Sequence, residues 1–174
     1  MVKKLKEDFF GRDCLEVAPE LVGKILVRRL PDGEVLRERI AETEAYRGEE
    51  DKACHASKGK TKRTEVMYGE SGKIYVYLCY GMHWLMNITT GQNEQPQCVL
   101  IRAGKVHKGP AKLTKYLQID GSFNKCGICE NPDIWIEDDG FRPEIKTDKR
   151  VGIDYAGDYW KNMEWRFIAD GGIA

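Results

Sequence analysis

Hydrophobic and polar positions alternate along much of the chain, which predicts a protein rich in β-strands. Residues 24–30 form a short run typical of a strand, and the turn residues Pro31, Asp32 and Gly33 end it. Residues 35–46 alternate in a similar way and predict a second strand. One face of that strand is expected to carry Ile40, Glu42, Glu44 and Tyr46.

A β-hairpin is predicted between residues 73 and 90, with Gly81 near its turn. Tyr75 and Tyr77 fall on one face of the first arm, because successive side chains of a strand point to opposite faces. Further short strands are predicted at residues 98–103, 134–136 and 164–168.

Two helices are also predicted. The first covers residues 13–22, with Asp13 as its N-cap and Gly23 after its end. The second covers residues 109–118, where Pro110 suits the first helical position. This mixed order predicts an α+β fold in a single domain over residues 1–174. We expect a curved, mostly antiparallel sheet with a protruding β-hairpin and flanking helices.

The composition agrees with a folded domain. Of the 174 residues, 41% are hydrophobic and 10% aromatic, which excludes an intrinsically disordered chain. No stretch approaches the roughly 18–20 apolar residues that cross a bilayer, so no membrane association is expected. The N-terminal residues run into acidic side chains and do not predict a signal peptide. We expect an intracellular protein, either cytoplasmic and nucleoid-associated or nuclear.

The charge is balanced overall but unevenly distributed. The chain has 28 Lys and Arg residues and 28 Asp and Glu residues. Between Lys52 and Lys115, eleven Lys or Arg residues stand against three Glu and no Asp, a net charge of +8. Such a segment can present a basic face to phosphates. The alternative is an ordinary solvated surface rich in lysine.

Six cysteines are present, but a disulfide framework is not expected in a chain of this length without a secretory signal. Cys126 and Cys129 have half of a zinc-site spacing, and no second Cys or His pair lies nearby in the sequence. A plain loop or a disulfide is the alternative. We therefore expect no metal.

Two segments carry candidate chemistry. Glu42 and Glu44 share a strand face with Tyr46, and a carboxylate beside an aromatic ring can orient water or stabilise a cationic transition state. An acidic strand edge facing solvent is the alternative. His55 lies at the start of a basic segment, where it is either a functional group or a hydrogen-bonded structural residue.

The hairpin is the richest segment in aromatic residues. An exposed tyrosine at its tip would gain little from packing, whereas a nucleobase or a base-pair step would cover its flat face. Within ten residues the hairpin carries Tyr75, Tyr77, Tyr80, His83 and Trp84. The alternative is that several of these rings, Trp84 above all, belong to the core.

These features together resemble one known family, the alkyladenine (3-methyladenine) DNA glycosylases of the methylpurine type. The resemblance runs from near Phe9 to Phe167. The matching segments are residues 26–30, 40–46, 75–82, 86–88, 99–103, 109–113 and 150–153. The connection between Arg102 and Gly109 is shorter than in many relatives, which leaves open any DNA contact made there.

The resemblance implies a role for each residue that matches the family pattern. Glu44 would be the general base that activates the attacking water, and Arg102 would help to hold that water. The pocket for the extruded base would be walled by Tyr46, His55 and Tyr77. Asn87 would disfavour the 2-amino group of normal guanine.

The hairpin tip would contact the duplex. Tyr80 resembles the residue that fills the hole left by the flipped nucleotide, and Met82 and His83 would brace the neighbouring step or the backbone. The resemblance thus implies a monofunctional DNA glycosylase of base excision repair, which removes alkylated or deaminated purines and leaves an abasic site. We expect duplex DNA containing a damaged purine as the partner, a monomer, no metal and no organic cofactor.

Two other functions fit parts of the sequence. A non-catalytic module that binds damaged nucleic acid would use the same hairpin and basic segment but would tolerate the change Glu44→Gln. An enzyme acting on free nucleosides would show activity independent of salt, whereas DNA binding weakens steeply as salt rises.

Overall fold

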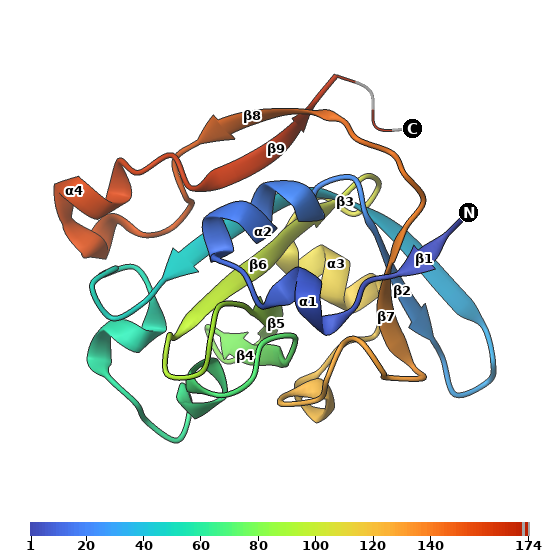
Figure 1. The fold of residues 1–174 in the computed structure, drawn as a ribbon, viewed down its shortest axis with the longest axis horizontal. Helices are drawn as coiled ribbons and strands as arrows, with labels where there is room; N and C mark the ends of the chain where they lie inside the picture. The colour runs from blue at the N-terminus through green and yellow to red at the C-terminus, as the bar shows by residue number, and fades with distance from the viewer. Residues whose placement is uncertain (172, 174) are drawn as a thin grey trace.

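The computed structural model describes residues 1–171 and residue 173. Within them, nine strands form one sheet (Figure 1). Seven of them follow the order β1-β7-β2-β3-β6-β5-β4, and the other two, β8 and β9, form a ribbon in which β9 pairs with β3. The strands are β1 (Lys3–Lys4), β2 (Ile25–Arg29), β3 (Val35–Arg47), β4 (Ile74–Cys79), β5 (His83–Thr89), β6 (Gln97–Gly104), β7 (Ile134–Asp138), β8 (Glu144–Asp148) and β9 (Arg166–Asp170). The paired strands are antiparallel, which confirms the expected α+β fold.

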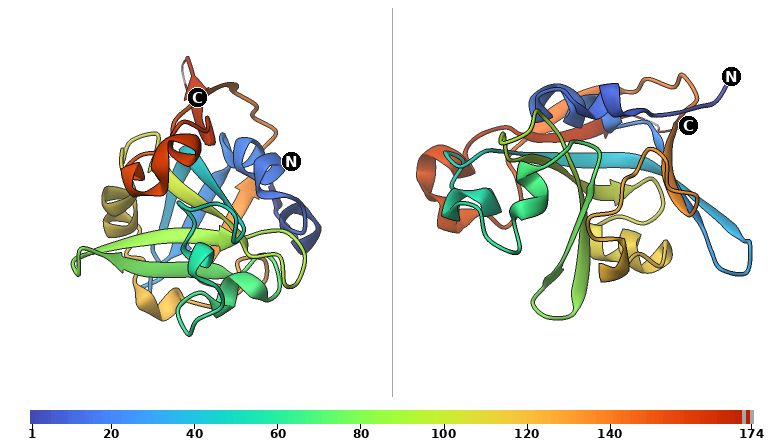
Figure 2. Two further views of the ribbon diagram at one scale, coloured as in Figure 1. Left: turned by 90° about the vertical axis from the view of Figure 1, so that its left-hand side faces the viewer. Right: turned by 60° about the horizontal axis from the view of Figure 1, so that its bottom comes forward.

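Helices cover both faces of this sheet. They are α1 (Glu7–Phe10), α2 (Cys14–Leu21), α3 (Pro110–Tyr116) and α4 (Gly157–Lys161). The α2 helix begins after Asp13, whose carboxylate accepts a hydrogen bond from the backbone N–H of Leu15 at 3.0 Å. In the right-hand view of Figure 2, α2 lies above the long β3 strand and α3 lies below it. Both predicted helices are confirmed, and each is slightly shorter than expected.

The long β3 strand links the two halves of the sheet. Its first half pairs with β2 and its second half with β6, with an irregular register between Ile40 and Thr43. Such a bulge shifts the alternation of side chains by one residue. Ile40 therefore packs in the main core with Ala45, while Glu44 lines a cavity. The expectation that Ile40 shares a face with Glu44 is wrong for this reason.

The predicted hairpin is present as β4 and β5, paired from Ile74 with Ile88 to Cys79 with His83. Both views of Figure 2 show it projecting from the body of the protein. Its outer edge is covered by the segment containing Cys126, whose carbonyl accepts from the N–H of Ile74 at 2.8 Å. Cys126 and Cys129 are free thiols, so this segment serves as a loop that covers a strand edge.

The described residues contain no cluster of three or more His, Cys, Asp or Glu side chains that could hold a metal ion. Among the helices of residues 1–171, none combines the length and the apolar character needed to span a membrane.

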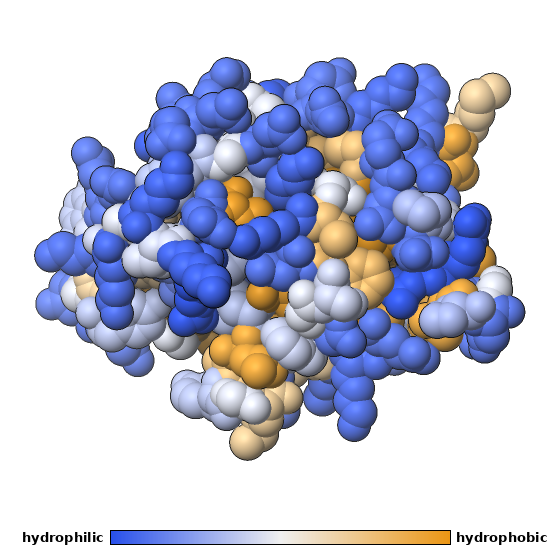
Figure 3. Space-filling model, turned by 90° about the horizontal axis from the view of Figure 1, so that it is seen from below, coloured by the Kyte–Doolittle hydropathy of each residue, from blue (hydrophilic) through white to orange (hydrophobic). Residues whose placement is uncertain are grey.

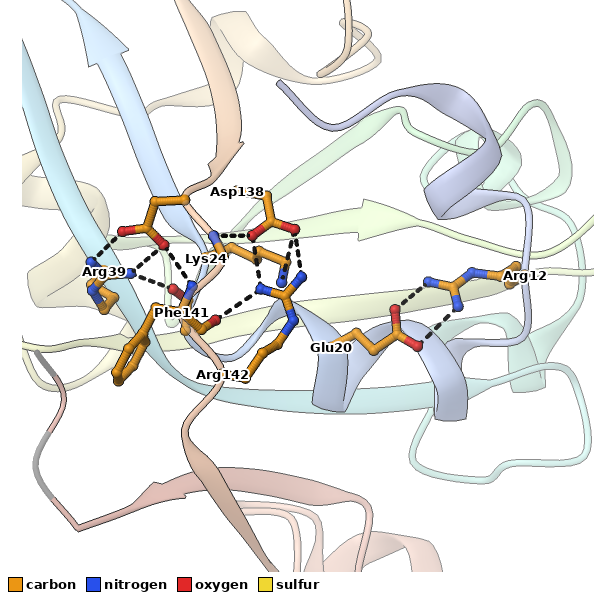
Figure 4. A network of polar contacts seen from close by, with 10 residues as sticks. Arg12, Glu20, Lys24, Arg39, Asp138, Phe141 and Arg142 are labelled. Carbon is orange, nitrogen blue, oxygen red and sulfur yellow. Dashed lines mark hydrogen bonds and ion pairs between the residues drawn. The ribbon is translucent and has the colours of Figure 1, made fainter. Parts of the chain in front are cut away.

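A network of ion pairs away from the cavity joins β3 and the residue before β2 to the end of β7 and the segment after it (Figure 4). Lys24 is only 2% exposed, and its amino group lies 3.4 Å from the carboxylate of Asp138. Asp138 also pairs with Arg142 at 2.8 Å. Arg39 binds Asp139 at 2.7 Å. Each buried or half-buried charge here therefore has a charged partner, which offsets part of the cost of removing it from water.

Candidate active site

A cavity of about 510 Å³ opens beside the hairpin, a size suited to a small organic group. Its walls come from β3, β4, β5, β6 and the start of α3, together with the segments after β3 and β8. Eight of the nine predicted site residues line it: Glu44, Tyr46, His55, Tyr77, Tyr80, His83, Asn87 and Arg102. The ninth, Met82, lies at the exposed tip of the hairpin, outside the lining.

Strand alternation brings the polar residues of the site together. Glu44 pairs with Leu100 of β6, so Arg102, two residues further along, lies on the same face of the sheet. The intervening residues of β3 point the other way: Ala45 packs in the main core, and the Thr43 hydroxyl donates to the carbonyl of Ala18 in α2 at 2.8 Å.

The Glu44 carboxylate is completely buried at the inner side of the cavity. One oxygen, Oε1, accepts from the backbone N–H of Val151 at 2.8 Å. The other, Oε2, accepts from the Tyr46 hydroxyl at 2.7 Å. Burial raises the pKa of Glu44, and the nearby Arg102 guanidinium opposes that rise. A carboxylate with a raised pKa is suited to accept a proton from water.

Arg102 lies between two carboxylates of β3. Its Nε atom is 3.1 Å from Oε1 of Glu42 and 3.5 Å from Oε1 of Glu44. Glu42 is also bound by Arg166 of β9 at 2.9 Å. Glu42 therefore fixes the position of Arg102 and neutralises part of the positive charge beside Glu44.

Aromatic rings form one wall of the cavity. The rings of Tyr75 and Tyr77 lie 5.4 Å apart, and the His55 ring meets the Tyr77 ring edge-on at 4.7 Å. Nδ1 of His55 is 2.8 Å from the Tyr75 hydroxyl. Burial, with the nearby cations Arg63 and Lys58, lowers the pKa of His55 to about 4, so its ring is neutral near pH 7.

Asn87 is held in one orientation on this wall. Its amide nitrogen donates to the carbonyl of Tyr75 at 3.2 Å, and its amide oxygen faces the Cys98 thiol at 3.7 Å. The side chain is nearly inaccessible to water, so it presents a fixed polar surface to whatever enters the cavity.

The hairpin tip combines exposure with backbone strain. Tyr80 is 90% exposed and has a φ of 52°, a left-handed conformation that favours glycine or asparagine. Met82 beside it is 69% exposed. In Figure 3 the protrusion at the lower edge carries hydrophobic surface on a mostly hydrophilic face. An exposed, strained tyrosine next to a cavity is typical of a binding residue, because packing does not explain it.

Several contributors to the site are not apparent from the sequence. Val151 acts through its backbone N–H, which no side-chain pattern reveals, although it lies in a segment that matches the family. Arg63 belongs to the basic segment, yet its guanidinium lies 5.0 Å over the Tyr77 ring. Tyr155 also lines the cavity, and its hydroxyl donates to the carbonyl of Ala53 at 3.0 Å.

Comparison of the sequence with known families identifies the family to which the chain belongs. The family model of methylpurine-DNA glycosylase matches residues 8–109 and 104–172. The chain belongs to the methylpurine-DNA glycosylase family. The two matched segments overlap at residues 104–109, from the end of β6 to the start of α3.

Individual relatives cover nearly the same length. A protein of Psychrobacter cryohalolentis is 43% identical over 88% of this chain and 86% of its own length. One of Methanocella arvoryzae is 42% identical over 94% of this chain and 90% of its own. One of Rickettsia felis is 39% identical over 94% and 92%. Each carries the name "Putative 3-methyladenine DNA glycosylase".

Proposed function

We propose that this protein is a monofunctional DNA glycosylase that removes damaged purines from duplex DNA. In the proposed reaction, a water activated by Glu44 hydrolyses the N-glycosidic bond and leaves an abasic site. The observation that carries the proposal is the buried Glu44 carboxylate, held by the Val151 N–H and the Tyr46 hydroxyl inside an aromatic-walled cavity. The membership of the chain in the methylpurine-DNA glycosylase family supports the same reaction.

The cavity would receive the base after it rotates out of the duplex. Stacking on aromatic rings contributes about 1–3 kcal/mol per base, comparable to the few kcal/mol that unpairing a base costs. A purine alkylated on a ring nitrogen carries a positive charge, which favours the faces of Tyr46 and Tyr77. Because His55 is neutral, it does not repel such a base. Asn87 would disfavour the 2-amino group of undamaged guanine.

The chemical step needs a base for water and a negative charge near the sugar. As the glycosidic bond breaks, positive charge develops on the sugar, and the Glu44 carboxylate stabilises it. Glu44 takes one proton from the attacking water, whose oxygen bonds to the anomeric carbon, while the bonding electrons leave with the base. Arg102, fixed by Glu42, would help to orient that water. The residues lining the cavity in the described chain include no lysine, so water is the nucleophile in this proposal.

The hairpin would hold the opened duplex. Tyr80 at its tip would occupy the space left by the flipped nucleotide, with Met82 and His83 against the adjacent step or the backbone. The segment between Lys52 and Lys115 would supply contacts to phosphates through its +8 charge. We propose that the protein acts as a monomer on duplex DNA.

The test is release of free base from duplex DNA carrying one methylated purine or one hypoxanthine, measured with enzyme in excess. The wild-type protein should release the base, and Glu44→Gln should lose release while still binding the lesion duplex. The exposed neighbour Glu50 provides a matched control, because Glu50→Gln removes the same charge outside the cavity lining. Binding without release from any lesion would instead favour the non-catalytic binding module.

A further inference from the structure

A buried ion pair, formed by Asp51 and Arg150, lies next to the candidate active site. The side chains of Asp51 and Arg150 are both fully buried, and Nη1 of Arg150 lies 2.6 Å from Oδ2 of Asp51. A second bond, Nη2 to Oδ1, measures 2.9 Å, so the pair is bidentate. Burying two charges is costly, and an apolar pair of similar volume would often be as stable. Stability alone therefore does not account for this pair.

The pair connects three segments that build the site. Arg150 donates to the carbonyl of Ala45 at 2.9 Å, in the residue between Glu44 and Tyr46. Asp51 accepts from the backbone N–H groups of Arg47 at 3.1 Å and Ala53 at 3.0 Å. Arg150 also directly precedes Val151 in the chain. One ion pair thus fixes the end of β3, the turn that leads to His55 and the loop that supplies an N–H to Glu44.

Arg150 also contacts the second donor to Glu44. Its guanidinium carbon lies 4.8 Å from the centre of the Tyr46 ring and 5.0 Å from that of Trp165. A cation over the face of Tyr46 restrains the ring and withdraws electron density from its hydroxyl, which strengthens a hydrogen bond that the hydroxyl donates. That hydroxyl donates to Glu44.

From this arrangement we propose that Asp51 and Arg150 are positioning residues for Glu44: together they align the Val151 N–H and the Tyr46 hydroxyl that hold the carboxylate. The inference rests on the proposed function of Glu44 and goes beyond it. The catalytic carboxylate is thus oriented by a buried ion pair that itself never touches the substrate.

Charged and titratable groups from every element packed against Glu44 influence its pKa. They are Glu42 and Tyr46 of β3, Arg102 of β6, Arg166 of β9, and Arg150 and Tyr155 after β8. The test variants leave all of them in place except Arg150. If the pair aligns the two donors, its removal deprives the ionised carboxylate of fixed hydrogen bonds, and Glu44 becomes easier to protonate.

The experiment uses the double variant Asp51→Leu/Arg150→Met, which replaces the pair by apolar side chains and leaves no unpaired charge. Single-turnover base release should fall about 10–100-fold, as expected for a misplaced catalytic group. The acidic limb of its pH profile should move to higher pH. Binding to an abasic-site duplex should remain within a few-fold of wild type. Arg150→Lys keeps the charge but not the bidentate geometry, and it should also slow release. It serves as the test variant if the double variant does not fold.

A matched control is available in the network of Figure 4. Lys24→Met/Asp138→Leu removes another ion pair outside the cavity, formed by a buried lysine and a half-buried aspartate, so its rate and its acidic limb should equal those of wild type. If a folded Asp51→Leu/Arg150→Met protein, or Arg150→Lys, releases base at the wild-type rate with an unmoved acidic limb, the positioning role is wrong and the proposed function stands. If the wild-type protein itself releases no base from any lesion, the proposed function fails first.

Discussion

Glu44 in the cavity is fully buried and Asp138 in the ion-pair network is half-buried, and the two carboxylates are held by different kinds of partner. Asp138 is bound by Arg142 and Lys24, and the hydrogen bond from Arg142 lowers its pKa. Glu44 receives its close hydrogen bonds from neutral groups, and burial raises its pKa. Asp138 is therefore held firmly in its ionised form, while Glu44 can take up a proton more readily.

The two regions consequently contribute to stability in opposite directions. A carboxylate whose pKa is lowered on folding stabilises the protein above its unfolded pKa, and this contribution disappears as the pH falls. A carboxylate whose pKa is raised makes the folded state less stable once the pH rises above the unfolded value. Asp138 therefore adds to the stability of the folded protein at neutral pH, whereas the buried Glu44 carboxylate reduces that stability and leaves a group that can take up a proton.

The largest effect should come from Glu44→Gln. Base release should slow about 1,000-fold, within the range of general-base catalysis, because an amide does not accept the proton of water. The free energy of unfolding at neutral pH should stay equal or rise, because a buried charge is removed and an acceptor oxygen remains for one donor. Single-turnover kinetics and urea unfolding measure the two quantities. A variant that is slow only because it is unfolded would contradict the comparison.

The reverse pattern is expected for Asp138→Asn. Lys24 would lose its carboxylate partner while nearly buried, and the protein should lose about 2 kcal/mol of stability. The rate of base release per folded molecule should not change, since Asp138 lies outside the cavity lining. Urea unfolding and single-turnover release on the same preparation measure both. A clear loss of rate in fully folded protein would show that the two regions are not independent.

Tyr80→Asn should separate binding from stability at the hairpin tip. Asparagine followed by Gly81 suits a turn with two positive φ values, here 52° and 67°, so stability should rise by about 0.5–1 kcal/mol. Loss of the ring should weaken binding to a lesion duplex by about 1–2 kcal/mol. Tyr159→Asn, at another exposed tyrosine outside the cavity lining, should leave binding unchanged. Equal binding by Tyr80→Asn and wild type would exclude a binding role for the tip.

The smallest effect concerns Asp139. The Arg39 guanidinium lowers the pKa of Asp139 to about 2, from an ordinary value of 3.8. Its contribution to stability is present above pH 3.8 and is lost as the pH falls through about 2. Thermal unfolding between pH 5 and pH 2 should therefore show a shallower decline in Asp139→Asn than in wild type. Parallel curves would mean that this ion pair does not contribute.

Much of the site is predictable from sequence because it depends on strand periodicity. Glu44 and Tyr46 are two residues apart, as are Tyr75 and Tyr77, and each pair lines the cavity as alternation requires. The bulge before Thr43 cannot be predicted from strand periodicity, because one extra residue in a strand leaves no hydrophobic pattern in the sequence. The predicted face of Ile40 is wrong for that reason.

Other features depend on contacts between distant parts of the chain. The N–H that binds Glu44 comes from a residue 107 positions later, and a backbone donor has no residue type to recognise. The β8 strand is not predicted because all five of its residues are exposed, so it has no apolar run. Cys126 and Cys129 have a metal-like spacing, but their segment covers the edge of β4 as a loop.

The most direct test of Glu44 as the general base is the pH dependence of single-turnover base release by the wild-type protein and Glu44→Gln. If Glu44 is the general base, the wild-type rate falls at acidic pH with a midpoint above the ordinary glutamate value of 4.5, because burial raises its pKa. The residual rate of Glu44→Gln should then lack that acidic limb. An acidic limb that persists unchanged in Glu44→Gln, at a rate close to wild type, would contradict the assignment of Glu44 as the base.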